Sequence, residues 1–263
     1  MGVDYAAARK LIALAARLEN KGPALMLGRH RMHVRDRFRD RLEGDLAEHG
    51  FGLTWNDLHQ PDGFAETFFE ALGFPRVEAM DISDFEGAGI LHDLNAPVPD
   101  ALRDRYGLIY DGGTTEHVFD VASCMGNIDA MLTQSGVLAA CSPGNGWFNH
   151  GFYQFGPELV YGYWKHGCQY DVLSCSMLPV RPRFREVALP DPAERGKRIR
   201  MRGAQQAANR VYLYYEVMKT ASSRPYRAAM QTDYVRRWSD HDRAAERGET
   251  AFERRRQEQD AHV

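Results

Sequence analysis

The sequence has few cysteines and no long hydrophobic run, and each absence excludes a class of protein. Only four of its 263 residues are cysteine, and no two form a C-x-x-C pair or repeat a zinc-ligand spacing. A disulfide framework and a structural zinc site are therefore not indicated, and we expect reduced, structural thiols in a cytoplasmic protein. No run of about 18 apolar residues exists, so no membrane span is predicted. The first residues also lack the basic region, apolar run and cleavage site, in that order, that secretion needs.

The chain also lacks a strong excess of either charge. Its net charge is -3, which gives no bulk attraction to nucleic acid or to an anionic membrane. We therefore expect a small-molecule or saccharide substrate and no nucleic acid partner, and a homo-oligomer is compatible with the sequence. Hydrophobic residues make up 44% of the chain, which is ample for the core of one large domain or of one domain with an appendage.

Short apolar runs alternate with helical patterns through most of the chain. The strand candidates are residues 23–28, 76–81, 89–92, 106–110 and 137–141, and the helix candidates are residues 5–20, 33–49 and 62–72. This alternation predicts parallel strands joined by crossovers, and so an α/β sheet wound on both faces. A later pair of strands, residues 170–178 and 210–218, is predicted to complete the sheet as an antiparallel terminal hairpin with a long insert.

Composition divides the sequence into three parts. We predict an N-terminal helix over residues 1–22, an α/β domain over 23–221 and a charged C-terminal tail over 222–263, which indicates an exposed or disordered helix. The insert at about 179–208 is rich in Pro, Arg and Glu, and it either covers the sheet end or extends to a neighbouring subunit. Its basic residues between 181 and 202 fit two interpretations: recognition of a phosphate or glycan carboxylate, or a solvated face balanced by acidic neighbours.

Carboxylates stand at the ends of consecutive predicted strands. Asp81 ends one strand, where the carboxylate of a nucleotide-binding βαβ unit accepts hydrogen bonds from two ribose hydroxyls. It equally fits a helix N-cap, because Ser83 and Asp84 follow. Asp93 follows the next strand, where a carboxylate and a neighbouring backbone N–H can hold an adenine edge. The order strand-Asp, strand-Asp, strand-Asp-Gly-Gly is what strengthens the nucleotide interpretation.

Four segments carry a resemblance to a known family: Met80–Ala88, His92–Asn95, Asp111–Val118 and Gly151–Leu159. Together they resemble the class I S-adenosylmethionine-dependent methyltransferases, and most resemble a bacterial subgroup often associated with surface-glycan or lipopolysaccharide gene sets. The resemblance spans about residues 23–178 and implies a Rossmann-like, mostly parallel, seven-stranded sheet. It also implies S-adenosylmethionine across the carboxyl ends of the first strands, with Asp81 at the ribose, Asp93 at the adenine and residues 111–113 at the methionine side. The implied cofactor-binding residues are Gly28, Arg29, Asp81, Ile82, Asp93, Leu94, Asp111, Gly112 and Gly113.

The loop after the first strand departs from the family pattern. Most members have an acidic residue and three glycines at alternating positions there, whereas this chain has Gly28 followed by Arg29, His30 and Arg31. A single glycine is a weak nucleotide-binding fingerprint. Two alternatives therefore stand beside the methyltransferase hypothesis. One is a protein of this fold that has lost S-adenosylmethionine binding and acts as a binding or assembly subunit, and the other is an enzyme of this fold that uses another ligand.

Methyl transfer to a hydroxyl needs a base, and histidine is the side chain best tuned for this near neutral pH. His117 and His150 both follow strand ends where an acceptor is expected, and Glu116 can orient or assist one of them. His117 also fits a structural role, in which it caps a helix expected to start at Thr114 or Thr115 and buries its ring against the sheet. The positive end of that helix disfavours an imidazolium, so His150, in a glycine-flanked loop that can move, is the predicted base. The catalytic candidates are His150, His117 and Glu116, and no metal ligand set is predicted.

An aromatic cluster surrounds His150 in the sequence. Its members are Trp147, Phe148, Phe152, Tyr153 and Phe155. These rings fit either a platform for a sugar or a hydrophobic lid on the sheet. With the neighbouring amides, the candidate substrate-binding residues are Trp147, Asn149, Tyr153 and Gln154. The predicted reaction is O-methylation of a saccharide or a similar polar metabolite.

Overall fold

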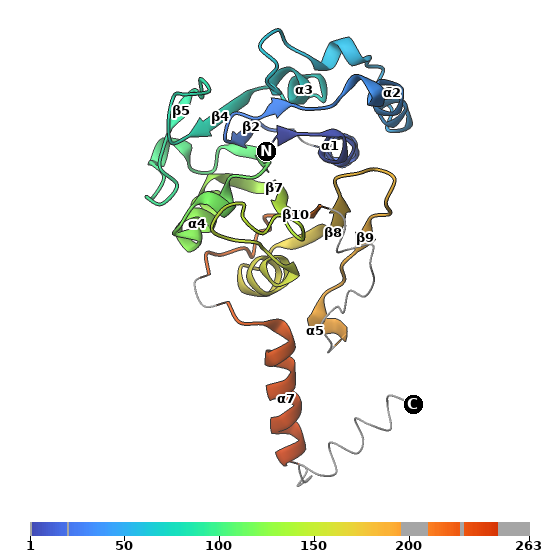
Figure 1. The fold of residues 1–263 in the computed structure, drawn as a ribbon. Coiled ribbons are helices and arrows are strands. Elements are labelled where there is room, and N and C mark those ends of the chain that lie inside the picture. The colour runs from blue at the N-terminus through green and yellow to red at the C-terminus, as the bar shows by residue number, and fades with distance from the viewer. Residues whose placement is uncertain (1, 20, 196–209, 227–228, 247–263) are drawn as a thin grey trace.

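An eight-stranded mixed sheet forms the centre of the protein (Figure 1), in a computed structural model that describes residues 2–19, 21–195, 210–226 and 229–246. The strand order is β5-β4-β2-β6-β7-β10-β8-β9. The strands are β2 (Ala24–Leu27), β4 (Val77–Asp81), β5 (Ile90–Leu91), β6 (Tyr106–Asp111), β7 (Leu132–Pro143), β8 (Asp171–Pro179), β9 (Val187–Ala188) and β10 (Val211–Met218). A separate parallel pair joins β1 (Gly2–Val3) to β3 (Arg31–Met32).

The direction of pairing divides the sheet into two parts. The strands β5, β4, β2, β6 and β7 are parallel neighbours, and β10 runs antiparallel to both β7 and β8. This confirms the predicted doubly wound, mostly parallel α/β sheet with an antiparallel terminal hairpin. The two-residue β9 lies in the predicted insert and adds an eighth strand at the edge, beside β8.

Both faces of the parallel part are covered, which explains why all four residues of β2 are buried. Ala24 and Met26 belong to one core cluster, and Leu25 and Leu27 belong to the other, because successive side chains of a strand point to opposite faces. Figure 1 shows α1 (Tyr5–Arg17), α2 (Arg39–Glu48) and α3 (Glu66–Ala71) on one side, and α4 (Val121–Met131) with the helix η5 (Leu159–Gly167) on the other.

The helices on the first face begin and end at residues that differ in part from those predicted. The side chain of Asp4 accepts a hydrogen bond from the backbone N–H of Ala7 and starts α1, which ends at Arg17 and not at the predicted residue 20. The helix predicted to start at residue 62 starts at Glu66, and Asp62, in the turn before it, accepts a hydrogen bond from the N–H of Phe64. The helix predicted from residue 33 begins only at Arg39 as α2, after the 3-10 turn η1 (Asp36–Phe38).

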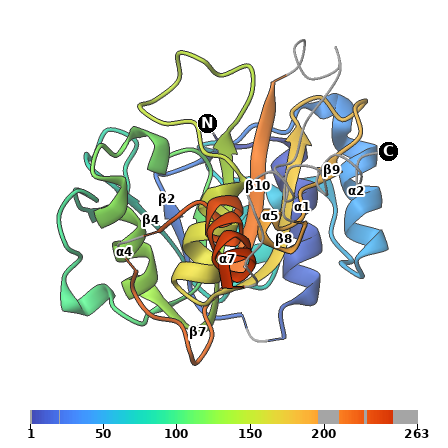
Figure 2. The same cartoon turned by 90° about the horizontal axis from the view of Figure 1, so that it is seen from below.

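The last described helix, α7 (Thr232–Glu246), projects away from the sheet in Figure 1, and Figure 2 views it nearly end-on over the helix side of the domain. Residues 196–209 of the predicted insert and 247–263 of the predicted tail lie outside the described residues. Among the helices that the structure describes, none has the length and apolar character needed to cross a membrane. All four cysteines are buried free thiols, as predicted.

The sheet order reverses between β2 and β6. From β2 the chain passes outward to β4 and β5, and then returns to β6 on the other side of β2. In an open α/β sheet, ligands bind at the carboxyl ends of the strands beside such a reversal. The predicted site residues Gly28, Asp81 and Gly112 directly follow or end these strands.

Candidate functional site

Gly28 brings three strand ends together. Its φ of +79° lies in the left-handed region that favours glycine. A Cβ at this position would lie 3.0 Å from Thr114 Oγ1 and 3.9 Å from Asp81 Oδ2. The hydroxyl of Thr114 donates to the carbonyl of Leu27 at 2.5 Å, which holds the loop after β6 against the end of β2. The carboxylate of Asp81, the backbone of Gly28 and the loop after β6 therefore share one small space.

Asp81 is not a helix cap. No helix follows it, because residues 82–87 form bends and a turn, so the N-cap interpretation is wrong. Its Oδ1 accepts a hydrogen bond from the N–H of Ile82 at 2.7 Å, while Oδ2 lies on the side of Gly28. The side chain of Ile82 is 69% exposed, which leaves an apolar surface next to this carboxylate.

Asp93 and Leu94 occupy the loop after β5. Oδ1 of Asp93 accepts hydrogen bonds from the backbone N–H and the side-chain amide of Asn95, and these bonds hold the pKa of Asp93 below its usual value. Leu94 is buried in the core, so only its backbone can contact a ligand. The loop thus presents an exposed carboxylate with a rigid backbone behind it.

The carboxylate of Asp111 faces its own loop. It is fully buried, and Oδ1 accepts hydrogen bonds from the N–H groups of Gly113 and Thr114 at 3.1 and 2.8 Å. The hydroxyl of Thr115 donates to Oδ2 at 2.5 Å. Asp111 therefore shapes the loop, and the loop's backbone and Thr114 face Gly28. Gly113 has a φ of +110°, which this tight turn requires.

His30 was not among the predicted site residues, and the structure buries it under this loop. Its Nε2 accepts a hydrogen bond from the N–H of Gly112 at 3.0 Å. Burial lowers the pKa of His30 to about 3, so the ring is neutral. A Cβ on Gly112 would lie 2.8 Å from this nitrogen. Within the run of three basic residues, the sequence offers no signal that the middle one is a neutral core residue.

Arg29 turns away from this space. Its guanidinium pairs with Glu66 at 2.6 Å and with Asp62 at 2.8 Å, and it lies over the ring of Phe64 at 3.9 Å. The predicted contact of Arg29 with a cofactor is therefore left to its backbone.

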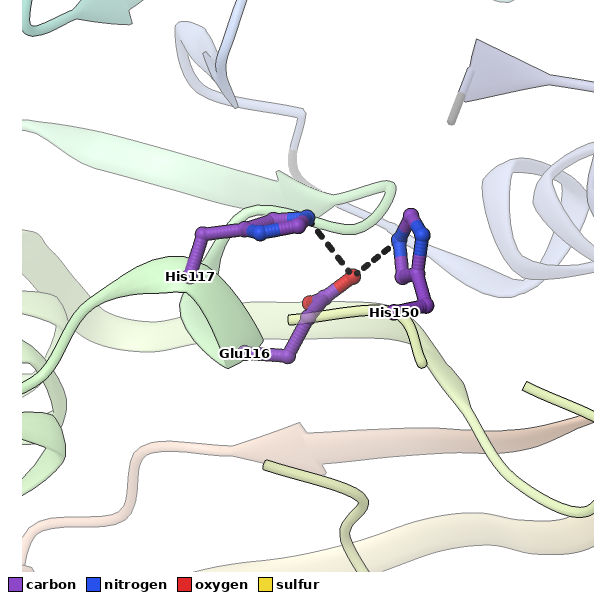
Figure 3. Close-up of side chains that lie close together, drawn as sticks. All are labelled: Glu116, His117 and His150. Carbon is purple, nitrogen blue, oxygen red and sulfur yellow. Dashed lines mark ion pairs between the residues drawn. The ribbon is translucent and has the colours of Figure 1, made fainter. Parts of the chain in front are cut away.

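The three catalytic candidates meet at the ends of β6 and β7 (Figure 3). Glu116 Oε1 lies 3.3 Å from His150 Nε2 and 3.7 Å from His117 Nε2, and the two rings are 4.8 Å apart, edge to face. We call these residues the Glu116–His117–His150 cluster. The Glu116 side chain is 0% exposed, and that of His117 is 48% exposed. The cluster thus joins a buried carboxyl to two imidazoles that solvent can reach.

Burial decides the charge of the cluster. It raises the pKa of Glu116 to about 8, with the nearby carboxylate of Asp111 adding to the effect. Burial also lowers the pKa of both His117 and His150. Glu116 could form ion pairs with the two histidines only if their rings were protonated, and burial disfavours protonation of these rings. At neutral pH we therefore assign a protonated carboxyl beside two neutral imidazoles.

The loop after β7 reaches the cluster through a glycine. Gly151 has a φ of +71°, and a Cβ there would lie 2.8 Å from Glu116 Cγ. The N–H of Phe152 donates to the carbonyl of Glu116 at 2.8 Å, and the N–H of Tyr153 donates to it at 3.3 Å. Gly151 therefore holds the loop of His150 against Glu116 through close backbone contact, in addition to the loop mobility that the sequence predicts.

The predicted place of His117 is correct only in part. It ends the 3-10 turn η4 (Thr115–His117), and α4 begins only at Val121, where Asp120 is the N-cap. The chain turns early because Asp111 gathers the N–H groups of the loop. A helix does start at Thr115, as predicted, but it is a single 3-10 turn with His117 as its last residue, and the ring of His117 is half-exposed and not buried against the sheet. The dipole reason for preferring His150 over His117 is thereby removed.

The predicted substrate-binding residues lie in two kinds of surroundings. Trp147 stacks on Tyr212 with a centroid distance of 5.6 Å and lies 5.3 Å from the ring of His150. The hydroxyl of Tyr153 donates to the carbonyl of Phe119 at 2.7 Å. Asn149 and Gln154 are exposed, and so are Phe148, at 96%, and Phe152. Trp147 thus packs on the sheet as a lid would, while Phe148 and Phe152, which flank His150 in the chain, are exposed.

No protein-family model and no curated protein matches the sequence. Among solved structures, the 1,6-didemethyltoxoflavin-N1-methyltransferase of Burkholderia thailandensis, with S-adenosylhomocysteine bound, is 15% identical with a TM-score of 0.43, and the match covers 82% of this chain and 80% of that one. A putative sarcosine dimethylglycine methyltransferase from Galdieria sulphuraria is 13% identical with a TM-score of 0.40, over 81% and 84% of the chains. TehB from Haemophilus influenzae is 14% identical with a TM-score of 0.40, over 80% and 62%. Similarity with TM-scores below 0.5 assigns neither a family nor a ligand to this chain.

Proposed function

We propose that this protein is an S-adenosylmethionine-dependent methyltransferase that methylates a hydroxyl of a saccharide or a similar polar metabolite in the cytoplasm. The observation that carries the proposal is the shared space at Gly28. Thr114 Oγ1 and Asp81 Oδ2, which come from beyond two other strands, lie 3.0 and 3.9 Å from the position that a Cβ on Gly28 would take. This space lies at the reversal of the strand order, where α/β sheets bind nucleotides.

The residues around this space fit the cofactor. The Oδ2 of Asp81, which lies near Gly28 and beside the exposed Ile82, would accept hydrogen bonds from the ribose hydroxyls. The carboxylate of Asp93 and the backbone of Leu94 would hold the adenine, and the loop from Asp111 would line the methionine side. When bound, S-adenosylmethionine supplies a methyl group already activated by the sulfonium.

The Glu116–His117–His150 cluster would serve the acceptor. A hydroxyl must lose a proton when it is methylated, and neutral imidazoles held near a buried carboxyl can take it. Figure 3 shows one nitrogen of His150 directed at Glu116, and the ring is partly exposed. The exposed amides of Asn149 and Gln154 and the exposed rings that flank His150 in the chain support a polar acceptor with an apolar face, such as a sugar.

Binding of S-adenosylhomocysteine tests the proposal. We expect stoichiometric micromolar binding by calorimetry, and Asp81→Ala should weaken it at least tenfold, because charge-assisted hydrogen bonds are worth roughly 1.5–3 kcal/mol each. The matched control is Asp84→Ala, which removes an exposed carboxylate from the same loop and should leave the affinity unchanged. Wild-type protein that is folded but does not bind would favour the binding-subunit alternative. Mass spectrometry of saccharides incubated with enzyme and S-adenosylmethionine should then show a gain of one methyl group.

A further inference from the structure

The Glu116–His117–His150 cluster has more polar capacity than its neighbours satisfy. Among the described residues, neither carboxyl oxygen of Glu116 nor Nε2 of His150 has a hydrogen-bond partner, although each is buried. A buried polar atom without a partner is costly, and such atoms are rare in folded proteins. The cluster is therefore built as if a further group completes it.

The donor types and their spacing point to the kind of group. Two imidazoles and one carboxylate each offer a ligand atom, and these atoms all lie within 4.8 Å of one another. Ligands about 2.0–2.2 Å from a shared ion lie about 3.0–3.5 Å apart. The separation of 3.3 Å from Glu116 Oε1 to His150 Nε2 falls in this range, and the 3.7 Å to His117 Nε2 closes with a small rotation of a half-exposed ring.

The chemistry selects among cations. Mg²⁺ and Ca²⁺ prefer oxygen ligands, whereas imidazole nitrogen suits divalent transition metals. Two histidines and one carboxylate leave coordination positions open for an exogenous ligand. The half-exposed side of His117 and the exposed loop at Asn149 leave this side of the cluster accessible.

We infer that Glu116, His117 and His150 bind a divalent transition-metal ion, with open positions that face the acceptor side of the site. The inference goes beyond methyl transfer and does not require it. An acceptor hydroxyl bound to such an ion would have a lowered pKa, so it could release its proton to solvent water, and His117 and His150 would act as metal ligands and not as the base.

Cobalt and zinc binding to the cofactor-free protein tests the inference. Protein treated with a chelator and desalted should bind one Co²⁺ per chain with a visible ligand-field spectrum, and Zn²⁺ should displace it. Glu116→Gln keeps the shape of the side chain but removes the carboxyl group that would bind the metal as a carboxylate. His117→Ala removes only a half-exposed ring, so this variant should fold like the wild type. Each of these substitutions, and His150→Ala, should weaken Co²⁺ binding at least about tenfold. Removal of a residue that only hydrogen-bonds to a metal ligand already costs about this much, and a ligand itself should cost more.

His92→Ala is the control, because His92 lies outside the cluster and contacts the carbonyl of Ala96. It should bind Co²⁺ like the wild type. Absence of stoichiometric binding, or wild-type affinity in folded His117→Ala and His150→Ala, would overturn the inference. Titration with S-adenosylhomocysteine is done separately on the same protein. Binding of Co²⁺ without binding of S-adenosylhomocysteine would support the metal site and contradict the methyltransferase proposal. Binding of S-adenosylhomocysteine without binding of Co²⁺ would support the methyltransferase proposal and overturn the metal site.

Discussion

At the residue scale, His30 shows how a basic residue can serve the site without charge. Its neutral ring lies under the loop after β6 and accepts the N–H of Gly112. A protonated ring could not accept this bond, and it would place a charge in the core. The neutrality of His30 is therefore a condition for the shape of the loop that faces Gly28.

The pH dependence of stability should report this burial. The pKa of His30 is about 3 in the folded protein and 6.5 ordinarily, so below pH 6.5 the unfolded chain binds a proton that the folded chain excludes. Stability is then fully present above pH 6.5 and is lost as the pH falls toward 3. Between about pH 7 and about pH 5 this loss is about 2 kcal/mol. Urea unfolding at the two pH values measures it.

His30→Asn removes the titration and is the comparison variant. It should be less stable than the wild type at about pH 7, because the acceptor of the Gly112 N–H is displaced. Its loss of stability between the two pH values should be smaller than that of the wild type by about 2 kcal/mol. Equal losses in both proteins would show that His30 titrates normally in the folded state.

At the element scale, the two loops after β6 and β7 make the cluster because neighbouring parallel strands end at one edge of the sheet. β6 pairs with β7 through Asp111 and Ala140, so Glu116 and His150 start from adjacent positions. The close approach of the loops then depends on Gly151, whose absent side chain lets the backbone lie on Glu116.

Gly151→Ala should separate the two loops. A methyl group would meet Glu116 Cγ and its carbonyl oxygen at 2.8 Å, and φ of +71° is unfavourable for alanine. Displacement of His150 should lower turnover by about 10²–10⁴-fold, the typical contribution of general-base catalysis, while S-adenosylhomocysteine affinity stays near that of the wild type. Gly156→Ala is the matched control, since a Cβ there meets no atom within 4 Å. Equal turnover in the two variants would mean that the position of His150 does not matter.

The strands of the sheet and the three residues of the Glu116–His117–His150 cluster could be predicted from the sequence. Apolar runs indicate buried parallel strands, and polar residues that follow such strands lie at one edge of the sheet. Glu116, His117 and His150 follow two of these strands, so they were predicted as catalytic candidates. The helix expected at His117 is only a single 3-10 turn, because the hydrogen bonds of Asp111 to its own loop, which no sequence pattern reveals, hold the chain there. The burial of His30 and the two-residue β9 depend on contacts with distant segments, which no local pattern records.

At the scale of the whole molecule, α1 ties the N-terminus to the sheet. Its apolar face lies in the same core cluster as β2, β6 and β7, and Arg17 at its end pairs with the fully buried Glu216 of β10 at 2.7 Å. The sequence predicts a domain boundary at residue 22. Because α1 packs into the core of the sheet, it can be tested whether residues 23–221 keep their fold when α1 is destabilised. A domain that folds alone would tolerate damage to α1.

Ile12→Ala should distinguish an appended helix from an integral one. Ile12 is 0% exposed within the shared core, so truncation to alanine leaves a cavity and should lower the free energy of unfolding by about 2–5 kcal/mol. Because the total stability of a domain is only about 5–15 kcal/mol, the whole sheet should then melt at lower temperature in one transition. Hydrogen–deuterium exchange by mass spectrometry, on peptides from α1 and from β10 across the thermal transition, measures the two parts separately. Ala16→Ser, at an exposed position of the same helix, should change stability by less than about 0.5 kcal/mol. Loss of protection in α1 while β10 keeps its wild-type midpoint would instead establish α1 as a separate unit.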